Sequence, residues 1–150
     1  MDLVDPNGLL VFWYHGIITY NAAMDSGLGI ISSVGLARDS MWADYETQDP
    51  GQAYLHAMAE KGENSYNAEN KVLNYINNPC APLGSRIHAA QDLSTPLHVG
   101  IEWTGFHFDM KTLNHFIGDI FPTDFTKNDA YWNTRYVLEG KHVVLFRPNW

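Results

Sequence analysis

Apolar residues recur at helical spacing along most of this chain, whereas long runs of alternating apolar and polar residues are scarce. The pattern predicts helices over residues 13–24, 34–45, 53–61, 67–76, 85–93, 113–121 and 130–138, and a short β-like tail over 142–146. Glycine, serine and proline separate these segments, at 26–35, 47–52 and 77–84. The expected fold class is mainly α, a compact multi-helix bundle.

Composition supports one folded domain. The 150 residues are 45% hydrophobic and only 17% charged, which is unlike a disordered chain. The formal net charge of −8 argues against a protein that grips nucleic acid through a basic surface. It does not exclude a nuclease that neutralises phosphate with bound metal. Cys80 is the only cysteine, which excludes a disulfide framework and a thiolate-rich metal site.

The most apolar stretch, residues 8–24, is interrupted by His15 and Asn21 and is too short for a membrane span. The acidic residues Asp2 and Asp5 stand where a signal peptide carries basic ones. We therefore expect neither a signal peptide nor a transmembrane segment.

Histidine and aspartate recur at spacings that suit metal binding. His88 and Asp92 are four residues apart in one predicted helix, so both project from the same face, and His98 follows six residues later. His115 and Asp119 repeat the four-residue spacing. Imidazole and carboxylate are the ligands that zinc accepts when thiolates are absent. The alternative is that these histidines are hydrogen-bonded core residues and the aspartates are surface charges.

The segment His88-Ala-Ala-Gln-Asp-Leu-Ser-Thr-Pro-Leu-His98 resembles the central signature of the superfamily that joins zinc-dependent phospholipases C to fungal single-strand nucleases. His15, Asp44, His56 and the His115/Asp119 pair resemble the other ligands of that family. The resemblance implies the helical fold of these phospholipases and a cofactor of two or three zinc ions.

Carried over residue by residue, the resemblance implies three sites. Asp44, His56, His88 and Asp92 hold the first zinc, His98, His115 and Asp119 hold the second, and His15 with a bridging Asp92 holds the third. Asp44 and Asp92 are the expected catalytic carboxylates, with Asp44 orienting the attacking water. Trp103, Phe106 and His107 are candidates for the lining of the substrate cleft, although aromatic residues at such positions are more often core.

Residues 1–9 resemble the end of an Rhs repeat-associated core, a shell whose C-terminal pieces are delivered bacterial toxins. We therefore expect a leader over 1–9 and a toxin domain over 10–150, delivered into target cells as a secreted effector. Cleavage after Leu9 exposes the amine of Leu10, which is expected to complete the third zinc site. The expected partners are the parent Rhs shell and a cognate immunity protein.

Three functions remain open from the sequence. The first is a phospholipase C-like toxin, and the second is a single-strand nuclease toxin that uses the same zinc cluster. The third is a non-catalytic binding module with structural histidines. The acidity favours a phospholipid substrate modestly over nucleic acid.

Overall fold

Helices account for most of the residues that the computed structural model describes, which are 9–47, 49–95, 98–99, 101–103 and 123–145 (backbone alone for 9–12). The elements are α1 (Leu9–Asp25), α2 (Ile30–Glu46), the 3-10 helix η1 (Pro50–His56), α3 (Ser65–Ile76), α4 (Leu83–Asp92) and α6 (Asp124–Leu138). Within these ranges the only β pairing is an isolated parallel bridge between Ala59 and Glu102. The mainly α class is confirmed.

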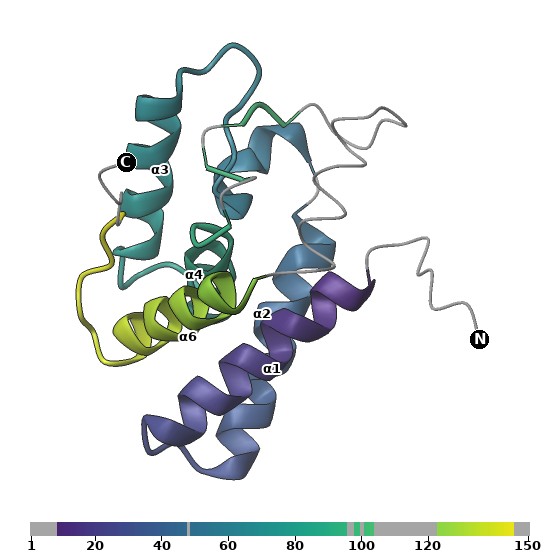
Figure 1. Cartoon of the computed structure of the whole chain (residues 1–150), viewed down its shortest axis with the longest axis vertical. Helices are drawn as coiled ribbons and strands as arrows, with labels where there is room; N and C mark the ends of the chain where they lie inside the picture. The colour runs from purple at the N-terminus through teal and green to yellow at the C-terminus, as the bar shows by residue number, and fades with distance from the viewer. Residues whose placement is uncertain (1–8, 48, 96–97, 100, 104–122, 146–150) are drawn as a thin grey trace.

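Helix α4 lies at the centre of the helical packing. It contacts α2, α6, α3 and η1, while α1 and α2 form a hairpin whose first helix also packs on α6 (Figure 1). The core around α4 contains Val72 and Ile76 from α3 and Ile87 from α4, all 0% exposed. No helix in the described residues combines the length and apolar character that crossing a bilayer requires.

The turn between α1 and α2 is tighter than the sequence pattern predicts. Gly27 has a φ of +85°, and the Leu28 N–H donates to Ala23 O at 3.0 Å, the usual way in which glycine ends a helix. Helix α2 begins at Ile30, so the loop predicted over 26–35 is wrong beyond residue 29. Packing of α2 against α1 and α4 outweighs the weak helix propensity of its serines and Gly35.

Helix α2, which carries Asp44, and helix α4, which carries Asp92, approach each other closely. A Cβ atom added at Gly84 would lie 2.7 Å from the Cβ and 2.9 Å from the backbone carbon of Asp39. Only glycine leaves room for this contact. The crossing brings the C-terminal turns of α2, which include Asp44, toward α4.

The helix predicted over 53–61 is wrong. Asp49 caps η1 by accepting from Gly51 N–H at 2.8 Å, with Pro50 in the first turn, so a 3-10 helix begins three residues earlier than predicted. It ends at Ala57, a left-handed residue with φ +55°. The chain then turns, and Ala59 N–H donates to Ile101 O at 2.9 Å. His56, the last residue of η1, is buried.

Caps also explain the other differences at helix ends. Asn64 accepts from Asn67 N–H at 2.9 Å and starts α3 at residue 65 rather than 67. Thr123 accepts from Thr126 N–H at 3.1 Å and starts α6 at 124 rather than 130. Helix α4 begins at residue 83, directly after Pro82, rather than at 85.

The predicted β-like tail is wrong over its described part, residues 142–145, which form no strand. Val143 instead exchanges hydrogen bonds with the Asn77 side chain at 2.9 and 3.0 Å. The helix predicted over 113–121 lies outside the described residues.

Candidate metal centre

Six of the predicted metal ligands come together in the interior, although they derive from five separate parts of the chain. They are His15 on α1, Asp44 on α2, His56 at the end of η1, His88 and Asp92 on α4, and His98 in the turn that follows. The four histidines and Asp92 are buried, and His88 is 0% exposed. The Asp44 side chain, at 19% exposure, is the most accessible of the six.

Asp92 lies at the middle of this cluster and uses both carboxylate oxygens. Its Oδ1 lies 3.3 Å from His15 Nε2. Its Oδ2 lies 3.2 Å from both His56 Nδ1 and His88 Nε2. A carboxylate with imidazoles against each of its oxygens has the arrangement of a ligand that bridges two metal ions.

His88 lies between the two halves of the cluster. Its Nε2 atom is 3.1 Å from His56 Nδ1 and 4.0 Å from Asp44 Oδ1. Two groups therefore have ligand atoms within 4.8 Å of one another, and His88 belongs to both: His15, His88 and Asp92, and Asp44, His56 and His88. Each group offers nitrogen and carboxylate oxygen, the donor set that zinc accepts.

Hydrogen bonds outside the cluster define which nitrogen of His56 carries a proton. The Thr47 hydroxyl donates to Ala43 O, so it can only accept from His56 Nε2, which lies 2.9 Å away. The Thr47 carbonyl, 3.0 Å from the same nitrogen, is also an acceptor. Nε2 therefore holds the hydrogen, and Nδ1 presents a lone pair to Asp92 Oδ2.

Two acceptors that face each other at 3.2 Å in a buried site repel unless a metal cation or a donor hydrogen, such as the Nε2–H of His88 at 3.1 and 3.2 Å from them, lies with them. With neutral histidines the cluster also keeps the two negative charges of Asp44 and Asp92. The donor chemistry, the lone-pair geometry and the charge therefore all fit a metal cation.

Buried charge interactions shift the acidities of the cluster. Burial by itself disfavours charge on Asp92, but His88, His98 and His15 together hold its pKa well below the usual range. Burial also acts against protonation of His88, yet the Asp92 charge and hydrogen bond leave its pKa raised above 6.5. Burial and neighbouring His88 lower the pKa of His15. Asp92 is thus the fixed anion of the cluster, and its charge favours a proton on His88.

His98 has a second role in the structure. Its Nδ1 lies 3.0 Å from the backbone carbonyl of His56, to which it donates, and 3.5 Å from Asp92 Oδ2. The turn after α4 is thereby joined to the end of η1. The second zinc site predicted for His98 also needs His115 and Asp119, which lie outside the described residues.

The predicted substrate-binding residues are described only in part. Trp103 is 7% exposed and packs with Ala53 and Met58 in a small core cluster. Phe106 and His107 lie outside the described residues, so their role stays a prediction.

Two residues that the sequence analysis did not identify support the cluster. Thr47 fixes the tautomer of His56, and Gln91 accepts from His15 Nδ1 at 2.6 Å. Gln91 is inside the His88–His98 motif, directly before the central aspartate, which is the one sequence signal that could have indicated it.

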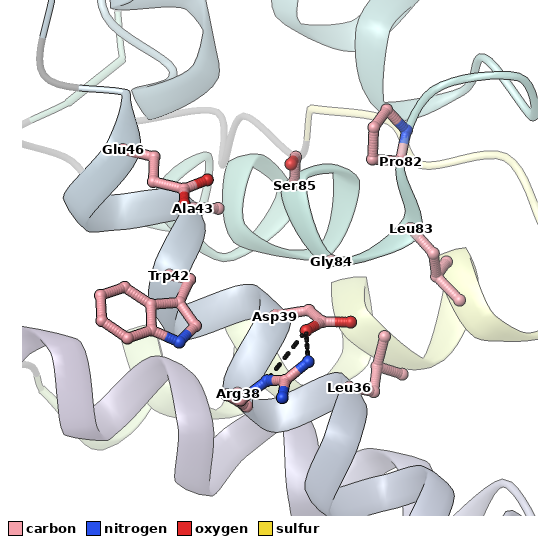
Figure 2. Close-up of a pocket in the computed structure, with 10 residues that line it drawn as sticks. All are labelled: Leu36, Arg38, Asp39, Trp42, Ala43, Glu46, Pro82, Leu83, Gly84 and Ser85. Atoms are coloured by element: carbon pink, nitrogen blue, oxygen red, sulfur yellow. Dashed lines mark hydrogen bonds and ion pairs between the residues drawn. The ribbon is translucent and has the colours of Figure 1, made fainter.

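A separate cavity of about 630 Å³ lies between α2 and the start of α4. Figure 2 shows Arg38, Asp39 and Trp42 on α2 across from Pro82 and Leu83, with Arg38 paired to Asp39. None of the metal-centre residues is among those that line it. The cavity is therefore distinct from the candidate metal centre.

Together the fold and the site define a mainly helical protein with a buried histidine–aspartate cluster suited to a metal ion. The chain matches no known protein-family model, no curated protein and no solved structure. A functional assignment therefore depends on the chemistry of the cluster and on the motif that supplies it.

Proposed function

We propose that this chain is a zinc-dependent phosphodiester hydrolase. The observation that carries the proposal is the lone pair of His56 Nδ1, which faces Asp92 Oδ2 at 3.2 Å in a buried cluster containing a second carboxylate. Zinc is the metal that best suits several imidazoles and carboxylates without thiolate. Asp44, His56 and His88 would hold one ion, and His15 would hold a second, with Asp92 bridging the two through its separate oxygens.

Zinc bound by these residues would supply a water of lowered pKa and positive charge against the phosphate. The chain's own residues then have separate tasks. Asp92 keeps the two halves of the cluster together through its two oxygens. Asp44 is the cluster's most accessible side chain, so it accepts a hydrogen bond from the attacking water and orients it.

The phosphodiester substrate class and the phospholipase C-like fold follow from the resemblance of the His88–His98 motif. The likeness of residues 2–9 to an Rhs core supports a toxin that is delivered into target cells and blocked by an immunity protein. A net charge of −8 favours phospholipid over nucleic acid. A nuclease with the same cluster is the alternative within this class.

One observation favours a second candidate, a non-catalytic module stabilised by a structural metal. Five of the six clustered side chains are buried, and structural zinc sites are closed in this way. The two candidates differ in whether a ligand position stays open to water. The exposure of Asp44 supports an open position.

The first experiment measures zinc per chain in protein purified without chelator, followed by hydrolysis assays. The substrates are phosphatidylcholine vesicles, single-stranded DNA and the small diester bis(p-nitrophenyl) phosphate. We expect two or three zinc ions and turnover that a chelator abolishes. Bound zinc without turnover of any substrate would favour the structural module, and no bound zinc would overturn both candidates.

A further inference from the structure

A buried amide side chain connects three helices beside the metal centre. Gln91 on α4 is 2% exposed, and its Nε2 donates at 2.9 Å to Thr19 Oγ1 on α1 and at 2.9 Å to Thr134 Oγ1 on α6. Its Oε1 lies 2.6 Å from Nδ1 of His15. The Gln91 amide is thus hydrogen-bonded at both its nitrogen and its oxygen, and the partner of the oxygen is His15, a candidate metal ligand.

The hydrogen bond made by Thr134 determines which way the amide faces. Thr134 Oγ1 donates its single hydrogen to Ala130 O at 2.7 Å, so it can only accept from Gln91. The amide nitrogen must face Thr134, and the amide oxygen must face His15. Because that oxygen has no hydrogen to give, Nδ1 of His15 carries the proton in their 2.6 Å contact.

The other nitrogen of His15 is then the one with a lone pair. Nε2 lies 3.3 Å from Asp92 Oδ1, inside the group that could hold a metal. In the opposite tautomer an Nε2–H would donate to this oxygen, and the nitrogen could not bind a metal. The amide orientation of Gln91 therefore decides whether His15 can act as a ligand.

We infer that Gln91 is a positioning residue that holds His15 in its Nδ1–H tautomer and so presents Nε2 to the metal. The inference rests on the proposed function for the identity of that metal, zinc. Outer partners of ligating histidines fix their tautomer and ring orientation, and their loss typically weakens metal binding about 10- to 100-fold. A carboxylate or a backbone carbonyl presents only oxygen to a histidine, so it always accepts the histidine N–H. A side-chain amide can rotate and present its nitrogen instead, so Thr134 is needed to hold the orientation of Gln91.

The test reads the His15 tautomer by nitrogen-15 NMR in the metal-free full chain, and zinc affinity by chelator competition. The unaltered chain should show Nδ1–H. In Gln91→Leu, Nε2–H should donate to Asp92, so the tautomer switches and the zinc dissociation constant rises about 10- to 100-fold. Gln91→Glu restores an acceptor and should restore the tautomer. Thr134→Val removes only the anchor and should give a mixture of tautomers.

Asn133→Leu is the matched control. The Asn133 amide also joins α6 to α4, through hydrogen bonds to Ala90 O at 3.2 Å and Ser94 Oγ at 3.0 Å. Its loss should lower stability and leave the His15 tautomer unchanged. Nδ1–H and full zinc affinity in Gln91→Leu would overturn the inference, as would an equal tautomer change in Asn133→Leu. Neither readout uses hydrolysis, so an inactive protein would refute the proposed function separately.

Discussion

His88 and Asp92 face each other across one turn of α4, with Nε2 of the histidine 3.2 Å from Oδ2 of the aspartate. Helical spacing alone brings this pair together, without any tertiary contact. The remaining members of the cluster arrive from α1, α2, η1 and the turn after α4. His88 and Asp92 are therefore placed by local helical structure, whereas the other members of the cluster are placed by tertiary packing.

Asp92→Asn should remove the bridging ligand while keeping the shape of the side chain. Asp92 uses both oxygens, so the amide can replace at most one of them and carries no charge. We expect the loss of at least one zinc ion per chain. Hydrolysis should fall by more than the roughly 100-fold that follows loss of an outer partner. Metal analysis and diester hydrolysis measure both effects.

Asp39→Asn is the control for this change. Asp39 also lies on the packed α2–α4 region, but its side chain is 54% exposed and pairs with Arg38 at 3.0 Å. Exposed pairs contribute at most about 1 kcal/mol. Zinc content and activity should therefore stay at the level of the unaltered chain, and equal loss in both variants would contradict a specific role for Asp92.

Gly84→Ala should separate α2 from α4. The new Cβ would lie 2.9 Å from the backbone carbon of Asp39, which cannot move without shifting α2. Overpacking of this kind costs about 1–3 kcal/mol. Because α2 carries Asp44 and α4 carries His88, zinc affinity should fall together with the free energy of unfolding, measured by denaturant titration and chelator competition.

Gly35→Ala, on α2, is the control for Gly84→Ala on α4 and should have the opposite effect on stability. A Cβ at Gly35 meets nothing within 4 Å, so this substitution should stabilise α2 by about 0.5–1 kcal/mol. Zinc affinity should not change. If both alanine variants behaved alike, close packing at Gly84 would not be what positions the cluster.

The sequence predicted the helical class and the residues that gather in the cluster better than it predicted where helices begin. Helix starts depended on side-chain caps such as Thr123, whose effect a periodic apolar pattern does not contain. The 3-10 helix was missed because its ending depends on left-handed backbone at Ala57, a residue type that ordinarily favours helix. The helix propensity of Ala57 is therefore outweighed by the turn that the chain makes after His56.

The residues that support the cluster could not be predicted from spacing. Gln91 and Thr134 are 43 positions apart and meet only because α4 and α6 pack together. Thr47 acts on His56 through a hydrogen bond between the end of α2 and the end of η1, which the periodic apolar pattern does not contain. The sequence shows residue types that can bind a metal, whereas the tautomers of the clustered histidines depend on tertiary contacts.

A chain that begins at Leu10 tests the expected role of the released amine. In the structure α1 already includes Leu9, and Leu10 precedes His15 by five residues, about 7.5 Å along a helix axis. The expected role of the amine requires the first turn of α1 to open and bring it to the cluster. If it does, this chain should bind one more zinc ion than the chain starting at Met1, measured as zinc per chain. Equal zinc content and equal activity would refute the idea.

The stability of the protein should depend on pH in opposite ways with and without zinc. The pKa of His88 is raised above 6.5, so without metal its contribution is complete below pH 6.5 and is lost as the pH rises through the raised value. Lowered pKa values act in the other direction: the His15 contribution is present above pH 6.5 and is lost on acidification, and the Asp92 contribution is present above pH 3.8 and is lost as the pH falls toward its lowered pKa.

With zinc present, protons compete with the metal for the same nitrogen of His88, so zinc affinity should rise over the pH range in which the metal-free protein loses stability. Thermal unfolding from pH 6 to 9, with chelator and with excess zinc, measures both trends. Asp92→Asn should remove the alkaline loss in the metal-free protein, because the His88 proton no longer has its charged partner. His142→Gln alters an exposed histidine outside the cluster and should change neither trend. Parallel pH profiles with and without zinc would contradict a metal bound at His88.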